Sequence, residues 1–452
     1  GIEIKEGSVG VYTIGNYVSL PSPATKDSYI YMAPSDKLTL TYSGSTSGNA
    51  TGIYYDNDLG QTIITPINVH LNVATANHTG IIAGIVAKDN IPGGTGSIIN
   101  SGNITTDTGG VYGIVAGDVD VFNSGSIDVG VLGGKGGTGI FSTRAGVSTD
   151  GSLIAVNGNN AIGIYAVNED NTTPVLPSLI SDRVISVTGT GTMNINDKNS
   201  VGVYVKDNGS GFLTLNNSTN LILNSNIINA TDRVIGLVLE NSQGNSNNNQ
   251  NTGNIKVNNY NVGIYLNDSN IINNSTFDLT NSLSGIGIFA TNAISNRKIE
   301  LQGSTFNITT SGTLNSDIPI GVYVSGNNYN INGGTGTIYN VGPNGIGNFL
   351  NGDSSSKTVG DFTYSLSSDT NNVAIGAYYL NGTFGDSGTV TLNSTGTLGD
   401  SPIGLFYGAN STQNKSDIIV NGSNELIGIY GKELNFSNLG DINLNTKSIG
   451  SY

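Results

Sequence analysis

A serine in a Gly-Asp-Ser-Gly sequence is the first feature that could carry chemistry. Residues Gly385-Asp386-Ser387-Gly388 match a pattern that can surround a nucleophilic serine. Such a serine needs a histidine base that is held in place by an acid, and the chain contains two histidines, His70 and His78. The same Gly-Asp-Ser triplet recurs at residues 352–354 and 399–401. Because the triplet recurs, we interpret it as a turn of a repeat and not as a catalytic site.

Carboxylates and metal-ligating residues are scattered rather than clustered. Asp118-Val119-Asp120 and Asp56-Asn57-Asp58 come nearest to the paired carboxylates that glycoside hydrolysis needs, and we expect both pairs to face solvent. His70 and His78 have no cysteine near them, so we expect satisfied or exposed imidazoles. Residues 133–136 approach a glycine-rich calcium repeat, but a lysine interrupts it and no aspartate follows in place. The sequence therefore predicts no catalytic residue, no metal and no cofactor.

Charge and composition narrow the classes of partner. The chain has 32 acidic and 17 basic residues among 452, a net charge of −15, which argues against nucleic acid or anionic lipid as a partner. It has no cysteine, so neither disulfides nor thiolate metal sites are available. No apolar run approaches the roughly 20 residues of a transmembrane helix.

A four-residue motif recurs along the chain: an apolar β-branched residue, a glycine, an aliphatic residue and an aromatic residue. Its clearest copies are Ile162-Gly163-Ile164-Tyr165 and Ile427-Gly428-Ile429-Tyr430. Successive motif glycines are mostly 22 to 34 residues apart, for example 24 residues from Gly139 to Gly163. A repeat of that length indicates a solenoid. The motif glycines, weaker copies included, are Gly10, Gly52, Gly84, Gly113, Gly139, Gly163, Gly202, Gly236, Gly263, Gly287, Gly321, Gly347, Gly376, Gly404, Gly428 and Gly450.

A second short strand precedes the motif in each repeat, as in residues 125–129 and 304–308. These segments alternate apolar and polar residues and are rich in Ile, Val, Phe and Thr, as half-buried strands are. The many Gly and Asn residues would interrupt any helix. Because identical strands recur one repeat apart, we expect each strand to pair in parallel with its copy in the next coil. The predicted fold class is all-β: a right-handed parallel β-helix of roughly fifteen coils with almost no helix.

Alternation predicts which motif side chains face the core. Ile162, Ile164 and Ala166 would point inward, and Gly163 and Tyr165 outward, so that the aromatic residues form an external ladder. The opposite facing, with the aromatic residues inside, stays open. Asparagines at turns could form amide ladders along the axis; these are Asn157, Asn216, Asn258, Asn393 and Asn421.

The chain divides by regularity into two parts. We expect residues 1–79 to be an irregular N-terminal part of the rod with insertions, and residues 80–452 to be regular repeats. The last residues, Ile449-Gly450-Ser451-Tyr452, stop within a copy of the motif. We therefore expect the chain to be a piece of a longer exported protein.

Taken together, the repeated Ile-Gly-Ile-Tyr strands, the Gly-Ser-Ile and Gly-Thr-x-x-Ile strands, the Asn-rich turns and the absence of cysteine resemble the passenger domains of type V autotransporters. The likeness is greatest to the very large fusobacterial-type adhesins, and it covers residues 80–452 well and residues 1–79 weakly. It implies an exported rod on the bacterial outer membrane, which contacts the membrane only through a C-terminal β-barrel outside these residues. It also implies binding to host-cell receptors or glycans, or to other bacteria. It assigns no individual binding residue.

Three functions remain open at this point. The first is a cell-surface adhesin that binds through loops projecting from the coils. The second is a structural spacer, with the adhesive tip elsewhere in the parent chain. A polysaccharide lyase or glycosidase on a β-helix is a remote third, because the carboxylate clusters of such enzymes are missing from the sequence.

A specific partner must contact segments that differ from one repeat to the next, because a uniform rod offers the same surface at every coil. The non-uniform segments are residues 13–51, 131–138, 168–182 and 240–254, and the last has few apolar anchors. We predict that contacts concentrate on 13–51, through tyrosines of the type common at hot spots, and on 168–182, where acidic residues lie beside stiffening prolines. The predicted contact residues are Tyr17, Tyr29, Tyr31, Tyr42, Glu169, Asp170, Pro174 and Pro177.

Overall fold

The structure is a computed structural model of the chain. It describes residues 2–4, 9–15, 28–29, 37–42, 48–57, 62–65, 67–73, 80–89, 96–168, 183–207, 213–224, 231–242, 249–310, 317–352, 356–369, 372–384, 388–394, 401–411, 416–422, 426–431, 440–445 and 449–451.

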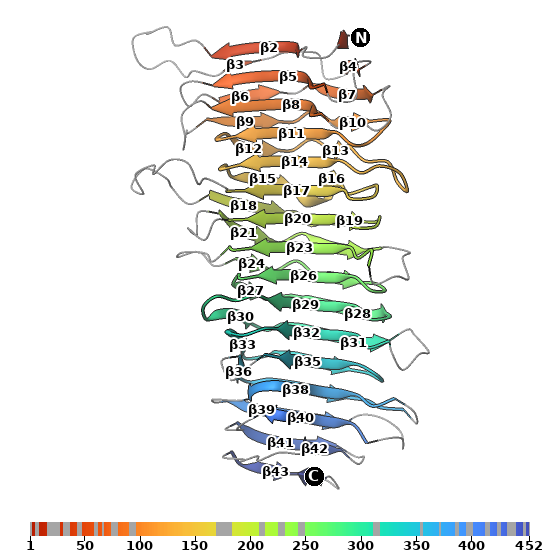
Figure 1. The fold of residues 1–452 in the computed structure, drawn as a ribbon, viewed down its shortest axis with the longest axis vertical. Helices are drawn as coiled ribbons and strands as arrows, with labels where there is room; N and C mark the ends of the chain where they lie inside the picture. The colour runs from red at the N-terminus through yellow and green to blue at the C-terminus, as the bar shows by residue number, and fades with distance from the viewer. Residues whose placement is uncertain are drawn as a thin grey trace. The chain divides into compact units, whose positions relative to one another are not determined.

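The chain forms two compact units. Short parallel β-strands build each of them (Figure 1). Unit 1 comprises Gly1–Asn220 with Gly244–Asn247, and unit 2 comprises Leu221–Gln243 with Asn248–Tyr452. Each unit is a β-solenoid, and the only helix among the described residues is a 3-10 turn, η1 (Gly151–Leu153). The predicted all-β solenoid with almost no helix is confirmed, while its right-handed sense stays a prediction.

Three stacks of strands make up unit 1, and the chain visits them in turn. The motif stack contains β2 (Val9–Gly15), β5 (Ala50–Asn57), β8 (Ile82–Asp89), β11 (Tyr112–Gly117), β14 (Thr138–Thr143), β17 (Ile162–Val167) and β20 (Val201–Lys206). The second stack contains β3 (Ser28–Tyr29), β6 (Thr62–Thr65), β9 (Ser97–Asn100), β12 (Asp120–Asn123), β15 (Val147–Asp150), β18 (Arg183–Thr188) and β21 (Leu213–Asn217). The third stack contains β1 (Ile2–Ile4), β4 (Lys37–Tyr42), β7 (Asn68–Val73), β10 (Ile104–Thr106), β13 (Ile127–Asp128) and β16 (Ile154–Ala155), and a parallel bridge from Val156 to Ile195 adds β19 (Thr192–Ile195).

Unit 2 repeats this arrangement. Its motif stack contains β23 (Ile235–Glu240), β26 (Val262–Asn267), β29 (Ile286–Thr291), β32 (Ile320–Ser325), β35 (Ile346–Asn351), β38 (Ile375–Phe384), β40 (Ile403–Ser411), β42 (Ile427–Gly431) and β44 (Ile449–Ser451). Its second stack contains β24 (Gln250–Asn251), β27 (Ile271–Asn273), β30 (Arg297–Leu301), β33 (Tyr329–Gly333) and β36 (Lys357–Gly360). Its third stack contains β22 (Asn220–Leu223), β25 (Ile255–Val257), β28 (Thr276–Ser282), β31 (Thr305–Thr310), β34 (Ile338–Val341), β37 (Phe362–Leu366), β39 (Thr389–Ser394), β41 (Asp417–Gly422) and β43 (Ile442–Leu444).

Counting the described motif-stack strands gives seven in unit 1 and nine in unit 2, which differs slightly from the roughly fifteen coils predicted. The described part of residues 1–79 supplies β1 to β7, and these strands join the same three stacks as the rest of unit 1. The described residues of this N-terminal part therefore follow the repeat.

Alternation breaks at the motif glycine, which corrects the predicted facing of two residues. In β17, Ile164 and Ala166 are buried and Tyr165 is half-buried, as predicted, but Gly163 is also buried and Ile162 is half-buried. Pairing with β20 joins Ile162 to Val201 and Ile164 to Val203 and passes over the glycine. Ile162 therefore lies on the outside, and Gly163 turns inward together with the residue that follows it.

A close approach of backbones explains why this position is glycine. A Cβ atom on Gly163 would lie 2.5 Å from the carbonyl oxygen of Gly202 in the next coil and 2.9 Å from Cγ2 of Val156. The corresponding contacts recur at Gly263, where the neighbours are Gly287 and Phe277. Any side chain would push the coils apart or displace a buried residue of the third stack, so glycine is needed for steric reasons.

Replacing Ile264 with Asp tests the packing of the core. Ile264 is fully buried in β26, so an unpaired carboxylate there should lower the free energy of unfolding by several kcal/mol. Asn267→Asp, which places the same charge on a half-buried outward position of the same strand, should change it by less than about 1 kcal/mol. Chemical unfolding followed by far-UV circular dichroism measures both, and equal stability of the two variants would contradict the assigned facing.

Candidate functional site

The residues predicted to bind a partner lie mostly outside the described part of the chain. These are Tyr17, Tyr31, Glu169, Asp170, Pro174 and Pro177. Tyr29 lies in β3, for which the structure gives the backbone. Tyr42 lies in β4 and exposes 2% of its surface. Its ring is therefore part of the core of unit 1 and not a surface contact, because the alternation of β4 turns it inward.

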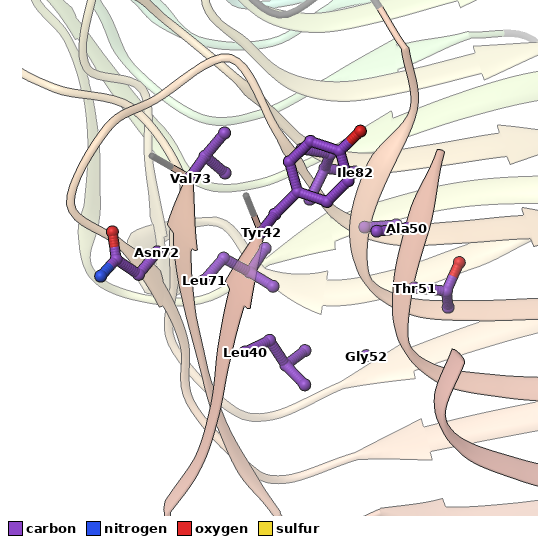
Figure 2. Close-up of a pocket in the computed structure, with 10 residues that line it drawn as sticks. Leu40, Tyr42, Ala50, Thr51, Gly52, Leu71, Asn72, Val73 and Ile82 are labelled. Atoms are coloured by element: carbon purple, nitrogen blue, oxygen red, sulfur yellow. The ribbon is translucent and has the colours of Figure 1, made fainter. Parts of the chain in front are cut away.

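A small apolar void lies beside Tyr42, between the third stack and the motif stack of unit 1 (Figure 2). Leu40, Tyr42 and Leu71 from the third stack face Ala50 and Ile82 from the motif stack across it. Its volume is about 10 Å³, which is at or below the space that one water molecule needs. The void is thus a packing gap and not a ligand site.

Asp118 and Asp120, predicted to face solvent, are instead each paired with an arginine. Arg144 donates from Nε to Oδ1 of Asp118 (2.9 Å) and from Nη2 to Oδ2 (2.6 Å), and Asp118 is buried. Nη1 of Arg183 lies 2.6 Å from Oδ2 of Asp120, whose Oδ1 accepts the backbone N–H of Gly146. Asp118 and Asp120 do not face solvent as predicted, because each carboxylate turns toward an arginine of another coil and a charge-assisted pair replaces its hydration.

Unit 2 contains a more deeply buried pair of the same kind. Arg297, the first residue of β30, donates from Nε and Nη2 to the two carboxylate oxygens of Asp268, at 2.7 and 3.0 Å. The side chains expose 7% and 4% of their surfaces. Asp268 Oδ1 also accepts the backbone N–H of Ile294. The pair therefore fixes the turn 292–296, which connects the motif stack to the second stack.

The other residues with catalytic potential are engaged or lie outside the described part. His70 in β7 makes two hydrogen bonds, between Nδ1 and Thr105 Oγ1 at 3.0 Å and between Nε2 and Asp107 Oδ2 at 2.9 Å, so the expectation of a satisfied imidazole is confirmed for it. His78, Asp58, Ser354 and Ser387 are not among the described residues. Within the described ranges, no group of three or more His, Asp or Glu side chains could hold a metal ion.

The motif aromatic residues of unit 2 form an external column, as predicted. Every ring is half-buried, and successive ring centroids are 4.4 to 5.5 Å apart. Four of the six neighbouring pairs are stacked, so their rings cover one another's faces, while Tyr265–Phe289 is tilted and Tyr323–Phe349 is edge-on. This aromatic column is Tyr265, Phe289, Tyr323, Phe349, Tyr378, Phe406 and Tyr430; a shorter column in unit 1 contains Phe141, Tyr165 and Tyr204.

An internal aromatic column in the third stack of unit 2 was not predicted. Phe277, Phe306, Tyr339 and Tyr364 are fully buried, with successive centroids 4.8, 4.6 and 5.1 Å apart. The alternative left open, with the motif aromatic residues inside, does not occur in the described coils of unit 2, because the motif rings are half-buried on the outside and these buried rings belong to the third stack. These rings lie in register with Ile255 of β25. The sequence signal was this alignment of aromatic residues with a buried aliphatic position of the same stack.

Asparagine ladders occur both at turns and inside the solenoids. At the surface, Asn196 donates to Asn157, Asn258 to Asn224 and Asn421 to Asn393, as predicted for Asn157, Asn258, Asn393 and Asn421; Asn216 is exposed. A second kind is buried and was not predicted: Asn100 donates to Asn123 at 2.7 Å in unit 1, and Asn251 to Asn273 at 2.7 Å in unit 2. These amides satisfy one another across coils, which a buried polar group requires.

Comparisons with protein-family models, with curated proteins and with solved structures return no match for this chain. In the described part of the chain, no helix has the length and apolar character needed to cross a membrane.

Arg297→Met tests the buried pair. It should lower the free energy of unfolding by about 3–5 kcal/mol, because Asp268 is left as a buried charge without its partner. The double variant Arg297→Met with Asp268→Asn should lose clearly less than the sum of the two single losses. Chemical unfolding measures the cycle, and additive single effects would show that the two side chains are not coupled.

Buried phenols predict a loss of stability at alkaline pH. Burial raises the pKa of Tyr329, Tyr339, Tyr364, Tyr379 and Tyr407 above the ordinary value of 10.0. Above about pH 10 the unfolded chain therefore loses protons that the folded chain keeps, so the stability present below pH 10 falls as the pH rises. The part of the phenolate absorbance that belongs to these buried tyrosines should appear only together with loss of the β circular dichroism signal. Tyr339→Phe, which keeps the ring stack, should move that transition to higher pH, and ionisation of all tyrosines in a fully folded chain would contradict the burial.

Proposed function

We propose that the chain is an adhesive module of a bacterial surface protein, displayed as the passenger of a type V autotransporter. Its ligand would be a host-cell protein receptor or glycan, or the surface of another bacterium. The carboxylates of Asp118, Asp120 and Asp268 are neutralised by arginines, which supports recognition rather than catalysis as the role of the described surface.

One observation carries this proposal: the outer face of the motif stack in unit 2 is apolar over many coils. Beside the aromatic column stands an aliphatic column in parallel register from coil to coil, made of Ile286, Ile320, Ile346, Ile375, Ile403 and Ile427. Ile286 and Ile346 are buried, and the other four are half-buried. A polar column of Asn267, Thr291, Ser325 and Asn351 borders the aromatic residues. Long apolar surfaces with a polar border are typical of protein interaction sites.

The geometry of the rings favours a protein over a sugar at this face. Sugars bind aromatic residues through open ring faces, and the stacked neighbours cover those faces here. The edges and the isoleucine methyl groups remain for contact with an apolar protein surface. The same stacking also favours the second candidate, a spacer, because rings that cover one another stabilise the solenoid without any partner.

Binding of the isolated chain separates the two candidates. Fluorescently labelled chain should bind host cells or partner bacteria saturably. Ile375→Thr with Ile403→Thr, which keeps β-branched strand formers, should reduce this binding about tenfold or more, since two apolar contacts are lost. Ile162→Thr makes the same change at the equivalent position in unit 1 and serves as the matched control.

The outcomes are distinct. No binding of the folded chain to any cell type would overturn the adhesin proposal and leave the spacer. Binding that survives the isoleucine changes but is lost on deletion of residues 168–182 together with Tyr29→Ala and Tyr31→Ala would place the contact in the projecting segments predicted from the sequence. Unfolding curves of each variant exclude loss of structure as the cause.

A further inference from the structure

A polar groove opens on the outer face of the second stack of unit 2, where β27 lies beside β30. Its volume is about 140 Å³, which corresponds to roughly ten water positions. It is lined by Asn270, Ile271, Ile272, Asn296, Lys298 and Glu300. It is more than ten times larger than the void beside Tyr42, and its lining is mainly polar.

The register of two strands builds the floor of this groove. Ile271 of β27 pairs with Ile299 of β30, and both side chains are buried. Alternation therefore turns Ile272 outward on β27 and turns Lys298 and Glu300 outward on β30. The groove thus has an aliphatic side chain next to a cation and an anion.

One wall of the groove is held by the buried ion pair. Asn296 immediately precedes Arg297, whose guanidinium is bound by Asp268, and the same carboxylate accepts the N–H of Ile294. On the other wall, Asn270 Oδ1 accepts the backbone N–H of Lys298 at 2.8 Å, which fixes the amide. Walls positioned in this way reduce the entropy lost when a ligand binds.

The charges of the groove cancel locally. Lys298 Nζ lies 3.9 Å from Glu300 Oε1, and Gln302 Nε2 lies 3.5 Å from Glu300 Oε2. The Lys298 side chain is 58% exposed and that of Glu300 is 26% exposed, so both can be reached by a ligand. A polyanion would need several cations without an adjacent carboxylate, and an apolar ligand would leave the amides and charges desolvated without partners.

We propose that this groove binds one neutral sugar unit of a glycan. A sugar hydroxyl donates and accepts hydrogen bonds at once, and the groove offers an ammonium donor, a carboxylate acceptor and two amides that do both. Ile272 offers a methyl surface to the C–H face of the ring. The inference rests on the proposed adhesive function and deepens it by naming a ligand class and a site, away from the aromatic column.

An extended peptide is the less suitable occupant. Peptides that add to a sheet need an open strand edge, and here β27 pairs with β24 and β30, and β30 pairs with β27 and β33. The main chain of a peptide would find no unpaired edge at the groove. Recognition must therefore come from side chains, which suits hydroxyl groups.

Saturation-transfer difference NMR on the full chain tests the site. The probes are glucose, galactose, mannose and N-acetylglucosamine, each added alone. Lys298→Met with Asn296→Ala should weaken binding of the responding sugar about tenfold or more, because a charged hydrogen bond and an amide are lost. Lys256→Met removes a half-buried lysine on the third stack of the same unit and should leave binding unchanged.

Each result bears on one proposal separately. Sugar binding that is lost in the groove variant supports the site, whether or not the chain adheres to cells. Cell adhesion without binding of any of the four sugars, or with sugar binding that the groove variant retains, overturns the site and leaves the adhesin proposal standing. Displacement of the sugar signals by a short neutral peptide, with tighter binding of that peptide, would replace the ligand class. Equal thermal unfolding of all variants keeps the comparison valid.

Discussion

Parallel pairing between successive coils is the constraint on which the rest of the structure depends. It places each residue directly over its counterpart one coil away, at a spacing of about 4.8 Å. Whatever stands at one position must then tolerate a copy of itself as its nearest neighbour. Aliphatic residues, stacked rings and amides do so. The asparagine amide can both donate and accept a hydrogen bond, and it pairs with its copy in Asn100–Asn123 and Asn251–Asn273. The repeat therefore favours side chains that can stack on a copy of themselves. Charged side chains repel their copies, which explains why only 11% of the residues are charged.

Two buried aspartates of this lattice, Asp118 and Asp268, are each paired with an arginine of another coil. A column of aspartates would repel itself, since like charges at this spacing cost energy even in a polar medium. The structure instead sets Asp118 against Arg144 and Asp268 against Arg297, with one partner in each coil. In the second pair, both groups are buried and the geometry is bidentate, so the pair costs desolvation but holds a single arrangement of the turn. Its role is to fix the backbone of the turn, and this fixes the position of Asn296, the residue before Arg297.

The fold could be predicted from the sequence because it is periodic, and the errors lie where the period is locally broken. Strand alternation located Ile164, Ile264 and the external aromatic column correctly. It failed at Ile162 and Gly163, because the backbone bends at the glycine and two consecutive residues face inward. It failed at Asp118 and Tyr42 for a different reason. A carboxylate looks solvated until the arginine in the next coil is placed, and tyrosine looks like a contact residue until the register of β4 is known. The groove at Lys298 could not be predicted at all, since it depends on residues from two strands and one turn.

Recognition in a repeating protein requires a departure from the repeat, and the two proposed surfaces depart from it in different ways. On the outer face of the motif stack in unit 2, the aromatic column repeats in each coil from β26 to β42, so a partner that contacts the rings has several similar positions one coil apart. Such a surface gives area and avidity but poor positional specificity. The groove lies on the second stack, beside the turn 292–296, and is lined by the Lys298–Glu300 pair. A ligand there has one register. If both surfaces bind, the groove would set the position of the ligand and the apolar face would supply the strength.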